Sequence, residues 1–90
     1  SDIAVRWGGE EFLMVLQDCS IEEATRIAEN LRQAVTQVRI AGRVMDIRIC
    51  IGVSEFDGVE TIDQTVSRAD TALYQAKQGG RNRVCVSRLA

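Results

Sequence analysis

The amino-acid sequence predicts an α+β domain whose elements follow the order β-β-α-β-α-β. The first observation is a pair of apolar runs joined by Gly8-Gly9, which is typical of a tight hairpin because such turns favour positive φ. The second is apolar residues at three-to-four-residue spacing over residues 21–36 and 61–78, which indicates two amphipathic helices. The third is the alternation of apolar and polar residues from Met45 to Val53, which predicts a strand.

Length and composition favour one small domain covering residues 1–90. Hydrophobic residues make up 46% of the sequence but aromatic residues only 4%, so the core is predicted to be aliphatic. The net charge of −2 provides no broad basic surface of the kind that binds nucleic acid. No apolar run approaches the roughly 20 residues that span a bilayer, and no segment resembles a secretion signal. We therefore expect a cytoplasmic domain without a membrane span or a nucleic-acid partner.

The N-terminal hairpin is predicted from the runs Asp2–Val5 and Phe12–Leu16, with Gly8 and Gly9 as its turn. The second run is continuously apolar, which is typical of a strand that is covered on both faces. Glu10 and Glu11 follow the glycines directly. Taken alone, these carboxylates fit either a solvated hairpin end or hard oxygen ligands for Mg²⁺ beside a phosphate-bearing substrate. Spacing does not choose between the two.

The first helix is predicted from Ile21 to Thr36, because Ser20 and Glu23 have the spacing of a capping box. After it, Val38–Val44 with its central Gly42 predicts a small hairpin. The next element is the strand Met45–Val53, whose apolar residues alternate with Asp46, Arg48 and Cys50 on the other side. Residues 55–60 then form an acidic loop.

The second helix is predicted to start near Thr61–Asp63 and to end near Gln78, where Gly79-Gly80 supplies a left-handed C-cap residue. Tyr74 is expected at the edge of its buried stripe, which comprises Ile62, Val66, Ala69, Leu73 and Ala76. A last short strand is predicted over Asn82–Val86.

Three cysteines, Cys19, Cys50 and Cys85, are widely separated and the sequence has no histidine. A zinc site needs closely spaced soft ligands, so the pattern argues against one. We expect reduced, structural cysteines.

Gly8-Gly9-Glu10-Glu11-Phe12 resembles the signature of the GGDEF family, the diguanylate cyclases, in its GGEEF form. Further stretches match that family in its own order: Asp2, Ile51–Ser54, Ser67–Asp70, Ala72–Tyr74, Ala76-Lys77 and Gly80–Val84. The resemblance covers essentially the whole chain and corresponds to the C-terminal half of a GGDEF domain. It implies a palm-like, ferredoxin-related fold that lacks the first strand and the first helices.

The resemblance also implies the chemistry, which is the condensation of two GTP molecules into cyclic di-GMP with Mg²⁺. Glu10 would ligate the metal and support deprotonation of the attacking hydroxyl, with Glu11 as its catalytic neighbour. Gly8 and Gly9 would let the backbone meet the nucleotide. Lys77 and Arg81 would hold the triphosphate, for which a point charge and a bidentate fork are suited. The alternative for this cationic pair is that it only complements the negative end of a helix dipole.

Other positions carry weaker implications of the resemblance. Asp2 stands where the family has the aspartate of an inhibitory product-binding site, of which it would be a remnant. Arg68 and Asp70 are expected to be structural. The resemblance implies a homodimer governed by an upstream sensor or receiver domain. Because a metal-binding aspartate on the first strand is missing, we expect the ninety residues alone to be inactive. The alternative is a non-catalytic nucleotide-sensing or dimerisation module.

The missing first strand has a structural consequence. In the family it lies between the strands that correspond here to Phe12–Leu16 and Met45–Val53. Unpaired strand edges seek partners. We therefore expect the chain either to close its own sheet differently or to pair with a second copy.

Overall fold

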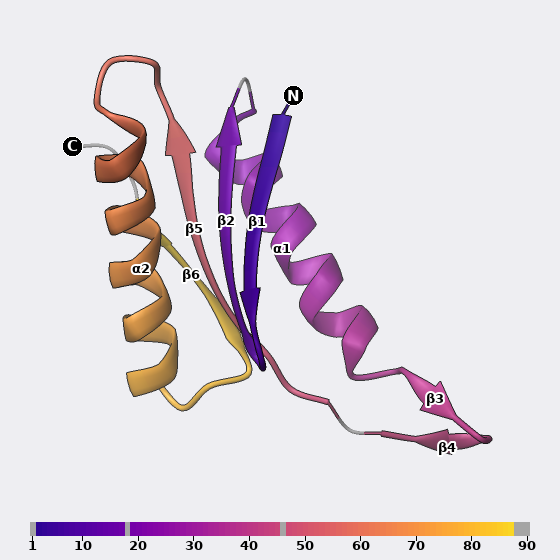
Figure 1. The fold of residues 1–90 in the computed structure, drawn as a ribbon. Coiled ribbons are helices and arrows are strands. Elements are labelled where there is room, and N and C mark those ends of the chain that lie inside the picture. The colour runs from indigo at the N-terminus through magenta and orange to yellow at the C-terminus, as the bar shows by residue number, and fades with distance from the viewer. Residues whose placement is uncertain (1, 18, 46, 88–90) are drawn as a thin grey trace.

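The computed structural model describes residues 2–17, 19–45 and 47–87. A four-stranded sheet of order β1-β2-β5-β6 forms its centre, and a two-stranded hairpin stands apart from it (Figure 1). The elements are β1 (Asp2–Gly8), β2 (Glu11–Gln17), α1 (Ile21–Val35), β3 (Arg39–Ile40), β4 (Arg43–Val44), β5 (Cys50–Phe56), α2 (Ile62–Gln78) and β6 (Arg83–Ser87). The predicted α+β class and element order are therefore confirmed, with the small predicted hairpin resolved as β3 and β4.

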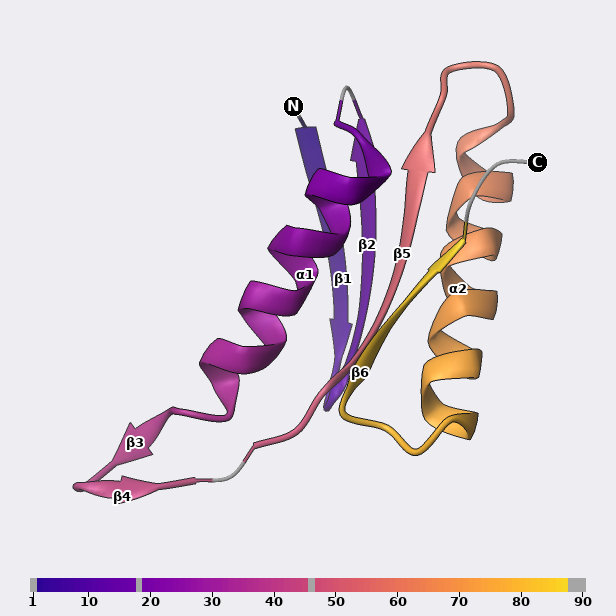
Figure 2. The same ribbon diagram turned by 180° about the vertical axis from the view of Figure 1, so that it is seen from behind.

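The two helices cover opposite faces of the sheet, as the two views in Figures 1 and 2 show. Successive residues of β2 alternate between these faces, because side chains of a strand point to alternate sides. Met14 and Leu16 pack with α1, whereas Leu13 and Val15 pack with α2. All four are at most 9% exposed, so the prediction of a strand covered on both faces is confirmed.

The turn between β1 and β2 lies one residue later than predicted. Gly8 pairs with Glu11 across the antiparallel ladder, which leaves Gly9 and Glu10 as the two loop residues. Gly9 has a φ of 69°, and the first central position is where a type II′ turn requires glycine. The correction moves Glu10 from a position just after the turn to the tip of the hairpin.

The gap expected from the missing strand is closed by direct pairing of β2 with β5, which run parallel with Leu13 opposite Gly52. The strands expected to flank a missing strand are thus direct neighbours. Of the two outcomes expected for the unpaired edges, this single chain adopts the first, in which its own strands pair with each other. On the other side of β5, β6 adds a further parallel pairing.

The strand predicted at Met45–Val53 is wrong in its bounds, since β5 covers Cys50–Phe56. Its first paired residue, Cys50, lies opposite Glu11, where β2 begins, so nothing earlier has a partner in that strand. Met45 instead belongs to the hairpin, where its N–H donates to the Val38 carbonyl at 2.9 Å. The predicted alternation itself holds, because Ile49, Ile51 and Val53 all pack on the α1 side.

The first helix begins at the predicted cap, Ser20, and the second begins within its predicted range, with Thr61 as its cap. The Ser20 hydroxyl accepts from the Glu23 N–H at 3.1 Å at the start of α1. At the start of α2, Thr61 and Gln64 form a complete capping box with hydrogen bonds of 3.1 and 2.9 Å. Such caps satisfy N–H groups that have no partner within the helix.

The buried stripe of α2 differs in part from the prediction. Ile62 is 53% exposed and Tyr74 61% exposed, so neither belongs to it. Thr65, which the prediction did not include, is fully buried. Its hydroxyl group can be buried at little cost because it donates a hydrogen bond to Glu60 Oε1 at 2.8 Å. The remaining buried positions are small or aliphatic: Ala69, Ala72, Leu73 and Ala76.

The close contact between α2 and β5 depends on Gly52. A Cβ at this position would lie 2.5 Å from the Leu73 nitrogen and 2.8 Å from the Leu73 Cα. Such distances are shorter than real Cβ contacts, and the obstacle is helix backbone, which has no rotamer to change. Gly52 therefore sets how closely the helix approaches the sheet.

Within the described residues, neither helix is long and apolar enough to cross a membrane. The three cysteines are free thiols; Cys50 is buried, with 2% of its surface exposed, and Cys19 and Cys85 are partly buried.

Candidate functional site

Glu10 and Arg81 line one pocket of about 370 Å³ at the end of the sheet where β2 and β5 begin. The residues that line it come from three separate segments: Glu10, Arg48, Cys50, Gly80, Arg81 and Asn82. The hairpin tip is fastened to the start of β5, because the Cys50 N–H donates to the Glu10 carbonyl at 3.0 Å. The fold thus brings together two residues that are far apart in the sequence and that the sequence had singled out separately.

Glu11 faces a different neighbour from Glu10. Its Oε1 lies 2.7 Å from Lys77 Nζ, which joins the start of β2 to the end of α2. This hydrogen bond, followed by the charges of Lys77 and Arg81, holds the pKa of Glu11 below its usual value. The two adjacent carboxylates therefore differ in their surroundings, because Glu10 lines the pocket and Glu11 is ion-paired beside it.

The loop after α2 carries Arg81 in an unusual backbone conformation. Gly80, Arg81 and Asn82 have consecutive positive φ angles of 114°, 63° and 47°. Gly80 supplies the left-handed residue predicted at the end of the helix, and the Arg81 N–H donates to the Ala76 carbonyl at 3.0 Å. This is the 6→1 hydrogen bond of a Schellman motif. The motif turns the chain so that Arg81 and Asn82 meet the pocket.

The described residues do not by themselves complete a metal site. They contain no group of three or more aspartate, glutamate, histidine or cysteine side chains placed to hold an ion. Mg²⁺ prefers octahedral oxygen coordination and commonly takes one or two carboxylates together with phosphate oxygens and water. Glu10 fits one position of such a set.

Asp2 lies far from this pocket. It pairs with Gln17 at one end of the β1–β2 ladder, whereas Gly8 pairs with Glu11 at the other. Asp2 and Gly8 are six residue steps apart along an extended strand, which corresponds to about 20 Å. The side chain of Asp2 lies outside what the structure describes.

Sequence reasoning did not assign Arg48 and Asn82 to the site. The sequence puts Arg48 only on the polar side of a predicted strand, although an arginine within an apolar alternation is itself a signal. Asn82 gave a weaker signal, as an asparagine following a helix C-cap, where left-handed φ is tolerated. Both line the pocket with Glu10.

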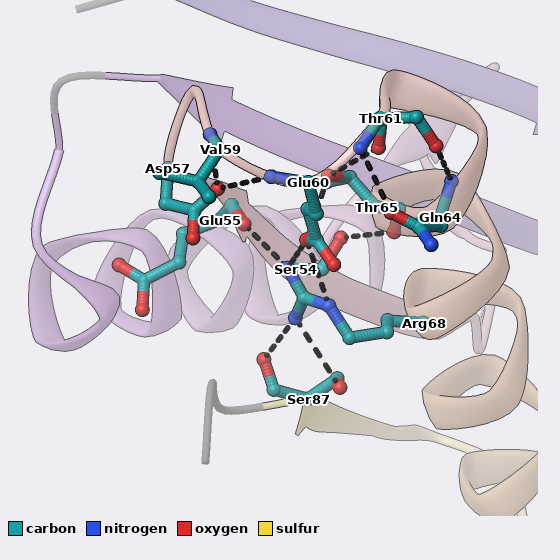
Figure 3. A network of polar contacts seen from close by, with 10 residues as sticks. All are labelled: Ser54, Glu55, Asp57, Val59, Glu60, Thr61, Gln64, Thr65, Arg68 and Ser87. Carbon is teal, nitrogen blue, oxygen red and sulfur yellow. Dashed lines mark hydrogen bonds and ion pairs between the residues drawn. The ribbon is translucent and has the colours of Figure 1, made fainter.

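Arg68 lies at the other end of the sheet and holds three segments together (Figure 3). Its guanidinium is ion-paired with Glu60 and donates to the Glu55 carbonyl at 2.6 Å and the Ser87 carbonyl at 3.1 Å. The side chain thus joins α2 to the loop before it and to the ends of β5 and β6. This agrees with the structural role expected for Arg68 from the sequence.

Comparison with known proteins gives a consistent result. Residues 1–83 match the family described as diguanylate cyclase, GGDEF domain. The chain is 43% identical over 83 residues to the diguanylate cyclase DgcM of Escherichia coli K12, covering 92% of this chain and 20% of that protein. It is 42% identical over 91 residues to diguanylate cyclase A of Treponema denticola, covering 98% of this chain and 24% of that protein. The chain thus spans about a fifth to a quarter of the length of these relatives. No solved structure matches it significantly.

Proposed function

The chain belongs to the GGDEF family of diguanylate cyclase domains, and from this premise we propose that it forms the C-terminal half of a domain that condenses two GTP molecules into cyclic di-GMP. The observation that carries the proposal is that Glu10 and Arg81 line one pocket. Beside this pocket, the Glu11–Lys77 ion pair joins β2 to α2. Two cationic and two anionic side chains that the sequence separates by about seventy residues are therefore assembled at one end of the sheet.

Lys77 and Arg81 are proposed to bind the triphosphate. Phosphoryl transfer depends on positioning and on stabilising negative charge at the phosphates. Arg81 offers a planar fork for two phosphate oxygens, and Lys77 offers a point charge that Glu11 neutralises in the absence of ligand. Gly8 and Gly9 leave space at the hairpin, since an added Cβ at either would meet no atom within 4 Å. The nucleotide backbone contact proposed for these glycines is therefore sterically open.

Glu10 is the proposed catalytic carboxylate of the pocket. Bound Mg²⁺ would neutralise phosphate charge and lower the pKa of the attacking hydroxyl. Glu10 contributes one ligand and an acceptor for that proton, and Glu11 orients Lys77. Cyclic dinucleotide synthesis joins two bound GTP molecules, so the proposed working unit is a homodimer under an upstream sensor or receiver domain. The proposed location is the cytoplasm, where GTP is available. Asp2 is proposed as the remnant of a product-inhibition site.

The ninety residues alone are proposed to be inactive, because one pocket carboxylate does not hold a metal unaided. The same observation favours a second candidate function, in which the chain binds nucleotide or dimerises without catalysis. The two are separated by grafting residues 1–83 in place of the matching segment of the Treponema denticola diguanylate cyclase A. The first proposal predicts cyclic di-GMP synthesis by the chimera and its loss in Glu10→Gln. GTP binding without synthesis by a folded chimera would favour the second.

A further inference from the structure

A chain of polar contacts connects α1 to the loop that carries Arg81. Arg32 donates to Glu29 through Nε at 3.1 Å and through Nη2 at 2.9 Å, which fixes the plane of its guanidinium. Its remaining group, Nη1, donates to Asn82 Oδ1 at 3.0 Å. Glu29 and Arg32 lie one turn apart on the helix, whereas Asn82 is fifty residues further along the sequence. The Arg32 side chain is only 18% exposed.

The loop needs such support, because its backbone is held in an unfavourable region. Arg81 and Asn82 have φ angles of 63° and 47°, and a left-handed conformation costs a residue with a side chain roughly 1 kcal/mol or more. Two contacts reach Arg81 through its own backbone: its N–H donates to Ala76, and its carbonyl accepts from Arg83 Nε at 3.1 Å. The contact from Arg32 ties this loop to the helix on the opposite face of the sheet.

We propose that Arg32 is a positioning residue for the phosphate-binding loop: oriented by Glu29, it holds Asn82 and thereby keeps Arg81 beside Glu10 in the pocket. The expected effect of Arg32 on phosphate binding rests on the proposed function, whereas its effect on the loop does not. Arg32 does not line the pocket itself, so its effect passes through Asn82. Its charge is compensated by Glu29, so its contribution is geometric rather than a long-range attraction of the ligand.

Helix α1 also carries a matched control for this contact. Arg26 and Glu23 form an ion pair at the same spacing, with atoms 3.7 Å apart and side chains 64% and 51% exposed. Arg26→Gln therefore removes the same charge from the same helix as Arg32→Gln, but the ion pair that it breaks lies within α1 and does not reach the loop. Arg32→Lys retains the charge beside Glu29 but lacks the fork that reaches Glu29 and Asn82 together.

The test uses two readouts on the ninety-residue chain. Hydrogen exchange of the Arg81 amide reports the order of the loop without any ligand. Calorimetric titration with inorganic tripolyphosphate and Mg²⁺ reports phosphate binding. Arg32→Gln and Arg32→Lys are expected to speed Arg81 exchange about tenfold and to weaken tripolyphosphate binding about tenfold, the effect of losing a charged hydrogen bond. Arg26→Gln is expected to change neither.

Two further variants show whether the effect passes through the loop. Asn82→Gly removes the acceptor without left-handed strain, and adding Arg32→Gln to it should change Arg81 exchange no further. In an Arg81→Gln background, Arg32→Gln should cause no additional loss of affinity. The proposal is overturned if Arg81 exchange in both Arg32 variants equals that of Arg26→Gln, or if the affinity loss persists in full without Arg81. Absence of tripolyphosphate binding in the unaltered chain would contradict the proposed function, while exchange would still decide the role of Arg32.

Discussion

Lys77 Nζ lies 2.7 Å from Glu11 Oε1, so the residue proposed to bind phosphate is already held by a carboxylate of the signature. A phosphate must compete with this carboxylate for the same ammonium group. Glu11 therefore keeps Lys77 in place beside the pocket and also lowers its availability.

Replacing Glu11 by glutamine is expected to tighten binding of metal-free tripolyphosphate by about 2- to 5-fold, because a partly exposed ion pair no longer competes with the ligand. Isothermal titration calorimetry measures the change. Glu55→Gln, which alters the same charge at the other end of β5, should leave affinity unchanged. Weaker binding in Glu11→Gln would show that Glu11 assists the phosphate rather than competing with it.

Stability is expected to fall in acid because Glu11 and Glu60 both have pKa values below their usual range. Lys77 is the main cause for Glu11, and the hydrogen bond from Arg68 is the main cause for Glu60. A carboxylate with a lowered folded pKa stabilises the fold above its unfolded pKa, about 4.5, and loses that contribution as the pH falls further. In urea unfolding between pH 7 and pH 3, the midpoint urea concentration should therefore fall below pH 4.5. Glu60→Gln should make this fall of the midpoint with pH less steep. If the pH dependence of the midpoint were the same in Glu60→Gln, the proposed contribution of Glu60 would be contradicted.

Arg68→Gln is expected to destabilise the fold by about 2 kcal/mol or more, because the carbonyl oxygens of Glu55 and Ser87 lose their donor. The free energy of unfolding in urea measures the effect. Arg39→Gln, in the exposed β3–β4 hairpin, is the charge-matched control and should change stability little. Equal free energies of unfolding for Arg68→Gln and Arg39→Gln would contradict the structural role assigned to Arg68.

Gly52→Ala is expected to be one of the most destabilising single-methyl changes in the chain, at about 2 kcal/mol or more, since its Cβ would overlap the backbone of Leu73. Gly8→Ala adds the same methyl group where no atom lies within 4 Å, and we expect a change of about 0.5 kcal/mol or less. Thermal unfolding of both variants gives the comparison. Similar melting temperatures would mean that α2 shifts away from β5 without penalty.

Local features of the fold were predictable because their causes are local. Ser20 and Thr61 begin helices through hydrogen bonds to residues three positions later, and Gly80 ends one through its own φ. The bounds of β5 were not predictable, since they depend on where Glu11 begins the neighbouring strand. Register across a sheet is a property of two segments, which no single run of residues contains.

The site was predictable in its charged signature residues but not in Arg48 and Asn82, nor in its arrangement. Glu10, Lys77 and Arg81 were identified by resemblance to a family, which gives no contact between them. The pairing of Glu11 with Lys77 and of Arg32 with Asn82 joins residues more than forty positions apart, and it follows from the packing of both helices on one sheet. Spacing along the chain carries no information on such contacts.

Lys77 and Arg81 are proposed to bind the triphosphate of GTP beside Glu10. Calorimetric titration of Mg²⁺-GTP into the chain tests it most directly, with Lys77→Gln/Arg81→Gln compared with Arg39→Gln/Arg43→Gln, which removes the same charge from the remote hairpin. We expect the unaltered chain and the hairpin variant to bind Mg²⁺-GTP equally, and the Lys77 and Arg81 variant to bind it at least about tenfold more weakly. Equal affinity of the two double variants would contradict it.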